Sequence, residues 1–331
     1  MEIPGDLRAA LEAELGATSA QVVTAARELS QRYRHGRTET ALPAVRSGDD
    51  ARAYAAYRMP ATYAAVRSVL AEAAMRRPDV RPSSLLDAGG GPGTAGWAAV
   101  SIWPELYSIT VLERDRKMMK LGRALAAHSA SRGVRNAEWR LTDLAADWSG
   151  NPADLVVAAF LLSEVPTLRV PALVARLWEH AIDVLSIVEP GTPAGYGLVV
   201  QATEELVRLG ASIAAPFPAD WHCTEGPGDW CHFSARVSRT RALRAVKAGT
   251  LPYEDEKYSY VVASKRPARA VAARVVRHPQ HRPGHVRLML CTAQGLKHLV
   301  VSRREREAYR RAKDLAWGSA IELDEAALFG L

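Results

Sequence analysis

The sequence predicts an α/β protein built on a doubly wound, Rossmann-like sheet, preceded by helices and followed by a small β-rich appendage. Three observations support this prediction. A glycine-dense turn follows an apolar run at residues 83–93, and further apolar runs alternate with helical segments up to about residue 265. After Pro267 the pattern changes to short alternating segments. The chain has 331 residues, of which 48% are hydrophobic, so it can bury a sizeable core.

Three parts follow from these patterns. They are an N-terminal helical region at residues 1–80, a main domain at 81–266, and a small basic β appendage with a closing helix at 267–331. In the first part, residues 6–15 place apolar side chains at helical spacing. Pro60 then separates residues 54–59 from a second helical run over 61–72.

Residues 83–93 form the first motif, in which an apolar run ends in Asp87 and then in a glycine-rich turn that opens a helix. Gly89, Gly91 and Gly93 let the backbone approach a ligand without Cβ obstruction, and the helix offers its N-terminus. The spacing differs from the Gly-x-Gly-x-x-Gly motif of dinucleotide-binding folds. It resembles instead the first motif of class I S-adenosylmethionine (SAM)-dependent methyltransferases.

The next strands follow at the spacing that such a fold requires. Residues 107–112 lead to Glu113, about 20 residues beyond the glycines, where a carboxylate can accept the ribose hydroxyls. Residues 137–141 lead to Asp143, where methyltransferases place an acidic side chain against the adenine amino group. Residues 153–162 are nearly all apolar, as in a strand buried on both faces. We therefore predict that SAM binds Asp87, Gly89, Gly91, Gly93, Glu113 and Asp143, the alternative being that the last two only close solvent-facing strand ends.

Later segments complete the predicted sheets. A fifth strand at residues 184–188 runs into a turn and a helix that extends through Leu209, and residues 253–264 form the last strand of the main sheet. In the appendage we predict short strands at 274–276, 285–290 and 297–301.

Positive charge is concentrated near the C-terminus. The formal net charge is +7, and residues 236–313 hold 20 Lys or Arg residues against 5 Asp or Glu residues. An excess this local predicts a surface that faces a polyanion, although a solvated face on an Arg-rich chain is the alternative. The predicted RNA-binding residues lie on a predicted helix and are Arg303, Arg304, Arg306, Arg310 and Arg311.

Composition also bears on location. No run of 18 uninterrupted apolar residues exists, and the first six residues are acidic and short of apolar side chains, so we expect neither a membrane span nor a secretory signal. The heavy use of Ala, Arg and Val is typical of GC-rich bacteria. The expected location is the bacterial cytoplasm, and the sequence does not indicate an oligomeric state.

All three cysteines lie in the second half of the chain. Cys223 and Cys231 stand in a Gly- and Pro-containing loop at residues 215–233, and Cys291 lies in the appendage. Thiolates beside histidine suit zinc or an iron–sulfur cluster, and His222 precedes Cys223. Unrelated reduced thiols are the alternative, which spacing alone does not exclude.

Over nearly its whole length the chain resembles the family of methyltransferase-like assembly factors of the small ribosomal subunit. The matching segments are residues 57–63, 87–93, 188–193, 229–233, 253–260 and 316–318. The resemblance implies a SAM-binding Rossmann-like domain, a partnership with the small ribosomal subunit and its rRNA, and a [4Fe-4S] cluster held by four cysteines.

One cysteine of that family pattern is replaced. The family's first cysteine belongs in an Ala-Pro-Cys-Pro segment, where this chain has Phe217, and Phe cannot ligate a metal. The other three cysteines would need a fourth donor, either His222, Asp220 or His232, or would leave one iron open. Zinc bound by three thiolates and one imidazole is the competing prediction.

The predicted chemistry is less definite than the predicted binding. Residues 160–164 read Phe-Leu-Leu-Ser-Glu where amino-group methyltransferases carry Asn/Asp-Pro-Pro-aromatic, and no cysteine follows a proline as in carbon-5 pyrimidine methyltransferases. Glu164 is a candidate base, with a capping or solvated carboxylate as the alternative. Three functions remain open: methylation of rRNA, SAM binding by an assembly factor without methyl transfer, and methylation of a small molecule.

Overall fold

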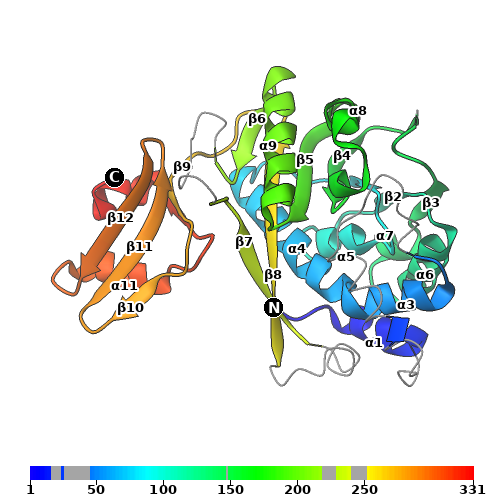
Figure 1. Cartoon of the computed structure of the whole chain (residues 1–331), viewed down its shortest axis with the longest axis horizontal. Helices are drawn as coiled ribbons and strands as arrows, with labels where there is room; N and C mark the ends of the chain where they lie inside the picture. Colours follow the sequence, from blue (N-terminus) through cyan, green and yellow to red (C-terminus); the bar gives the residue numbers. More distant parts are fainter. Residues whose placement is uncertain (16–23, 26–44, 147, 218–228, 240–251) are drawn as a thin grey trace.

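The computed structural model describes residues 1–15, 24–25, 45–146, 148–217, 229–239 and 252–331. Within these residues, helices precede an eight-stranded mixed sheet, and a five-stranded antiparallel sheet lies at the other end of the molecule (Figure 1). No helix in these ranges is both long and apolar enough to cross a membrane.

The elements of the N-terminal region and the main sheet are α1 (Gly5–Leu15), α3 (Gly48–Tyr57), α4 (Met59–Arg76), β1 (Ser84–Ala88), α5 (Thr94–Val100), β2 (Ser108–Glu113), α6 (Arg116–Ala127), α7 (Arg132–Arg135), β3 (Glu138–Leu141), β4 (Ala153–Ala159), η1 (Leu162–Glu164), η2 (Thr167–Arg169), α8 (Val170–His180), β5 (Ala181–Pro190), α9 (Pro193–Arg208), β6 (Ser212–Ala215), β7 (Phe233–Ser238) and β8 (Tyr253–Ser264). The C-terminal elements are β9 (Val271–Val275), β10 (Gln280–Arg282), β11 (His285–Thr292), β12 (Gly295–Ser302), α11 (Arg306–Asp314), β13 (Ala320–Glu322) and η3 (Leu323–Phe329).

The strand order of the main sheet confirms the predicted fold. The order is β3-β2-β1-β4-β5-β8-β6, and β7 pairs with the first half of β8. Strands β1 to β5 are mutually parallel, whereas β8 is antiparallel to both β5 and β6. This arrangement is the Rossmann-like sheet of class I methyltransferases, in which the carboxyl ends of β1, β2 and β4 meet at one edge.

Two hydrophobic cores cover the two faces of this sheet. Along β1, Leu85 belongs to the core shared with α4, α5 and α6, and its neighbour Leu86 belongs to the core shared with α8 and α9. This alternation is what a strand buried on both faces requires. A helix follows residues 54–59, as predicted, but α4 begins at Met59 rather than at residue 61 and has Pro60 in its first turn, because that position needs no backbone N–H donor.

The fourth strand is shorter than predicted. It ends at Ala159 rather than at residue 162, because Phe160 takes a left-handed conformation (φ 59°) and residues 162–164 form a 3₁₀ turn. The apolar run continues past the strand because Leu162 remains fully buried in that turn. The short strands β6, β7, β10 and β13 did not stand out in the sequence.

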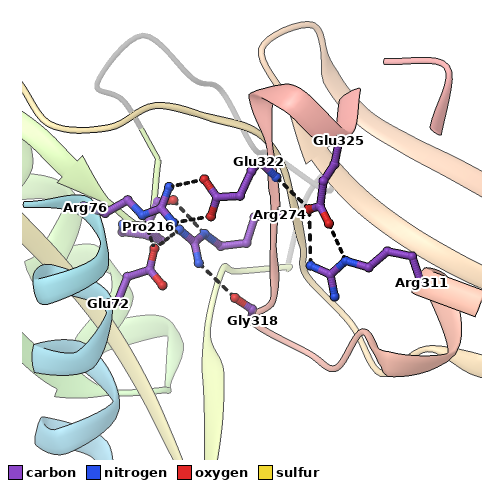
Figure 2. Close-up of polar contacts among 8 residues, drawn as sticks. All are labelled: Glu72, Arg76, Pro216, Arg274, Arg311, Gly318, Glu322 and Glu325. Carbon is purple, nitrogen blue, oxygen red and sulfur yellow. Dashed lines mark hydrogen bonds and ion pairs between the residues drawn. The ribbon is translucent and has the colours of Figure 1, made fainter. Parts of the chain in front are cut away.

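Buried ion pairs join the C-terminal sheet to the main domain (Figure 2). Arg274 on β9 donates from Nη2 to Glu72 Oε1 on α4 (2.5 Å), from Nε to the Pro216 carbonyl (2.8 Å) and from Nη1 to the Gly318 carbonyl (2.9 Å). Arg76 on α4 pairs with Glu322 on β13. The small sheet is therefore anchored to α4 through Glu72, Arg76 and Arg274, which are withdrawn from water, and through the partly exposed Glu322.

Candidate functional site

The glycine turn lies at the carboxyl edge of the sheet, between β1 and α5. Gly89, Gly91 and Gly93 all have positive φ angles, of 67°, 55° and 79°. A Cβ atom at Gly90 would lie 2.6 Å from both Asp87 Cγ and Val111 Cγ1. Glycine is therefore favoured at 89, 91 and 93 by the backbone conformation, and at 90 by close packing under the loop.

Asp87 lies beneath this loop with an exposed fraction of only 1%. Its Oδ2 atom has no hydrogen-bond partner among the described residues. Burial raises the pKa of Asp87 to about 7, and the charge of nearby Glu113 adds to the rise. A buried, incompletely satisfied carboxylate at a glycine loop is the kind of group that binding sites retain despite its cost.

Glu113 connects the loop to the next strand. Its Oε2 accepts from Gly91 N (2.8 Å) and its Oε1 accepts from Asp115 N (2.7 Å). Burial raises the pKa of Glu113. Because each carboxylate oxygen can accept a second hydrogen bond, these contacts orient Glu113 without using up its acceptor capacity.

The other predicted carboxylates have partners of their own. Asp143, at the end of β3, is exposed, and its Oδ1 accepts from Ala145 N (3.0 Å), a local turn contact. Glu164 pairs with Arg114 Nη2 through Oε2 (3.0 Å), which joins the end of β4 to the end of β2.

Sequence reasoning missed Glu189, which is fully buried at the end of β5. Its carboxylate accepts from Leu162 N (2.7 Å) and Ser163 N (3.3 Å), and burial raises its pKa to about 7. It thereby holds the turn that follows β4. The sequence signal that could have identified Glu189 is its position directly after the predicted strand at residues 184–188.

Arg58 was also missed. This residue, between α3 and α4, donates to both carboxylate oxygens of Glu256 on β8 (2.8 and 3.2 Å) and stacks over the Phe160 ring at 5.6 Å. The two partners lie 198 residues apart, so no local pattern could have revealed the pair.

Only two of the three predicted cysteine ligands, Cys231 and Cys291, lie within the described residues. Cys223 and His222 lie outside the described residues. Cys231 and Cys291 are both buried, and Arg274 ties Pro216, next to Phe217, to the strand pair that carries Cys291. Within the described ranges there is no group of three or more His, Cys, Asp or Glu side chains that could hold a metal ion. The described residues therefore give no evidence for an iron–sulfur or zinc site.

The basic residues of the C-terminal cluster divide into two sets. Arg303 and Arg304 lie in the turn before α11 rather than on the helix as predicted, because the helix begins at Arg306. Arg311 is paired with Glu325 through Nε and Oε1 (2.5 Å) and is half-buried. The other four arginines are exposed and have no ion pair within the described part of the chain.

Fold and loop together define a protein with the class I methyltransferase fold. Residues 48–322 match the model of the family described as "Mitochondrial small ribosomal subunit Rsm22". The chain belongs to this family.

Curated relatives agree with that assignment. The chain is 29% identical over 286 residues to the human "Ribosome assembly protein METTL17, mitochondrial", and the match covers 81% of this chain and 61% of the relative. It is 24% identical over 323 residues to "Rsm22-cox11 tandem protein 2, mitochondrial" of Schizosaccharomyces pombe, covering 82% of this chain and 43% of the relative. The chain thus spans less than two thirds of either relative.

Solved structures give a similarity in fold. Magnesium protoporphyrin IX methyltransferase from Synechocystis is 15% identical with a TM-score of 0.40, and covers 76% of this chain and 100% of its own. N-methyltransferase NodS from Bradyrhizobium japonicum is 13% identical with a TM-score of 0.38, and covers 60% of this chain and 93% of its own.

The comparisons correct one expectation. We expected a bacterial cytoplasmic protein, but the family description and the curated relatives are all mitochondrial. Genome-like composition was the only basis for the bacterial assignment, and it carries no physical information about location.

Proposed function

We propose that this protein binds SAM at the glycine loop and acts with the RNA of the small ribosomal subunit as a methyltransferase-fold assembly factor. The observation that carries the proposal is the family match over residues 48–322, which includes both the loop and the basic C-terminal sheet.

The loop residues fit SAM. Glycines with positive φ leave a cradle that a Cβ would fill, and Asp87 and Glu113 supply buried carboxylates at the ends of β1 and β2. Asp87, Gly89, Gly91, Gly93, Glu113 and Asp143 would hold the cofactor. SAM carries a positive charge on its sulfonium and ammonium groups, which carboxylates in a low-dielectric site attract. When bound, it would supply a transferable methyl group.

The end of β4 favours binding over methyl transfer. Leu161 Cδ1 lies 2.7 Å from where a Cβ of Gly89 would be, so a buried apolar side chain packs against the loop just after β4. Glu164 is committed to Arg114. We therefore favour an assembly factor that binds SAM, and keep rRNA methylation as the second candidate.

Two measurements separate these candidates. Isothermal titration with SAM tests binding, and incubation of immature small subunits with methyl-labelled SAM tests transfer. Binding without incorporation supports the assembly factor, and labelled rRNA supports the enzyme. A folded protein that does not bind SAM would contradict both.

RNA docking is tested in the cell. Ultraviolet crosslinking followed by sequencing of the bound RNA should enrich reads from small-subunit rRNA. Reads no richer than background would count against the ribosomal role and favour a small-molecule methyltransferase.

We also propose that Cys223, Cys231 and Cys291 hold a metal group, with His222 as the fourth donor and [4Fe-4S] or zinc as the occupant. What supports this is the burial of both described cysteines near the segment that carries Phe217. The test compares metal content and visible absorption of anaerobically purified wild type with Phe217→Cys and Cys291→Ser. Phe217→Cys should raise iron content and Cys291→Ser should lower it. Metal-free protein in all three cases would contradict the site.

A further inference from the structure

A second basic surface lies on the opposite side of the main sheet from the C-terminal cluster. A cavity of about 340 Å³ opens there between α6 and the edge strand β3. Its lining is formed by Arg116, Met119, Lys120, Arg123, Trp139 and Leu141. None of these residues belongs to the predicted cofactor site.

The charge around this cavity is one-sided. Arg116, Lys117, Lys120 and Arg123 are exposed on α6, and none has an ion pair within the described ranges. Asp115 is the acidic residue at that helix terminus, and its carboxylate is engaged in accepting from Lys117 N (2.7 Å) and Met118 N (3.1 Å). Four cations over 12 residues of helix, against the one carboxylate of Asp115, leave a local positive potential that attracts a polyanion.

Trp139 gives the cavity an aromatic wall in a fixed position. A Cβ on Gly122 would lie 2.1 Å from Trp139 Cη2, and a Cβ on Gly93 would lie 2.9 Å from the same atom. The ring is therefore wedged between two glycines, one on α6 and one in the cofactor loop. Arg123 Nη2 donates to the backbone carbonyl of Trp139 (3.2 Å), which places a cation at the open edge of the sheet, and both residues line the cavity.

Phosphate-binding cations around a partly exposed aromatic ring are what single-stranded nucleic acid requires, because the charges hold the backbone and the ring stacks a base. Duplex RNA does not present its bases in this way. We propose that the α6–β3 cavity binds a single-stranded segment of RNA, with phosphates on Arg116, Lys120 and Arg123 and a base against Trp139. This inference rests on the proposed role with ribosomal RNA and adds a second contact to it.

The test measures RNA binding by fluorescence anisotropy, with a labelled single-stranded RNA of about 16 nucleotides at several salt concentrations. The variant combines Arg116→Ala, Lys120→Ala and Arg123→Ala. A matched control removes the same charge from exposed arginines elsewhere, by combining Arg52→Ala, Arg169→Ala and Arg208→Ala. With about 0.7 of the salt slope lost per phosphate contact, the variant should lower the slope by about 2 and weaken binding about tenfold, while the control changes little.

The outcomes separate this inference from the proposed function. Wild-type protein that binds no RNA contradicts the RNA role itself. Wild-type binding that is weakened equally by variant and control overturns the α6–β3 site alone. Crosslinking of 4-thiouridine RNA, mapped by mass spectrometry, adds a position: crosslinks within residues 116–141 support the site, and crosslinks found only outside them overturn it.

Discussion

At the residue scale, Asp87 places a buried carboxylate under the glycine loop, and ionising this carboxylate lowers the stability of the folded protein. Burial raises its pKa to about 7 from an ordinary 3.8, so the folded protein holds a proton that the unfolded chain releases. Between about pH 4 and pH 7 the folded state therefore binds more protons, and the free energy of unfolding falls as pH rises through that window.

The first prediction concerns Asp87→Asn, which cannot ionise. The variant should lose less stability between pH 5 and pH 8 than wild type, with a gain on the order of 3 kcal/mol at pH 8. Urea unfolding at several pH values measures this. Some pH dependence should remain, because Glu189 has a pKa raised to about 7 by the same cause. The control Asp143→Asn removes an exposed carboxylate and should not reproduce the gain at pH 8.

The second prediction concerns Gly90. Its Cβ position is 2.6 Å from both Asp87 Cγ and Val111 Cγ1, so Gly90→Ala must displace the loop or the strand. We expect a loss of roughly 1–3 kcal/mol in unfolding free energy and weaker SAM binding by titration. Gly197 on α9 has no atom within 4 Å of its Cβ position, so Gly197→Ala should instead stabilise by about 0.5–1 kcal/mol. Equal effects of the two substitutions would contradict the close packing at the loop.

At the element scale, one helix organises the junction between the two sheets. Helix α4 packs against the main sheet, and its Glu72 and Arg76 face the appended sheet. Glu72 is shared between Arg274 Nη2 (2.5 Å) and Arg76 Nε (3.1 Å). Glu72 therefore contacts two guanidinium groups that are almost entirely buried, and Arg76 has Glu322 as a second partner.

The third prediction follows from that arrangement. Glu72→Ala should cost about 3–5 kcal/mol, because it leaves a buried guanidinium without its counter-charge. Thermal and urea unfolding measure the cost, and faster proteolysis between β8 and β9 would show that the appendage has loosened. Asp255→Ala removes the exposed pair with Arg236 and should cost less than about 1 kcal/mol. A Glu72→Ala variant as stable as this control would refute the role of the buried network.

The sequence was informative where a residue type answered a local requirement. Strand spacing, the glycines of the loop and Pro60 each have a physical reason within a few residues, and all were predicted. Long-range pairs such as Arg58 with Glu256 or Arg274 with Glu72 carry no such local signal. The basic face of α6 gives a weaker sequence signal than the C-terminal charge excess, although α6 carries four cations and no acidic residue.

At the scale of the whole molecule, positive charge lies at both ends. Figure 1 shows α11 beside the small sheet at one end of the long axis and α6 near β3 at the other end. The exposed arginines before and on α11 and those on α6 are therefore too far apart to share one phosphate. A protein charged in this way can hold one RNA at two separated points, which would restrict how that RNA folds.

The fourth prediction tests whether the two ends act on the same RNA. Arg303→Ala with Arg304→Ala should weaken binding to small-subunit rRNA and lower the salt slope by about 1.4, which is two phosphate contacts. Combined with the triple substitution on α6, the losses in binding free energy should add to within about 0.5 kcal/mol, because distant sites without shared partners behave independently. Electrophoretic mobility shift at several salt concentrations measures all three variants. The contrary result is a combined variant that binds rRNA as tightly as the weaker-binding of the double and triple variants. That result would show that the two ends do not bind the same RNA and that only one of them contributes to docking.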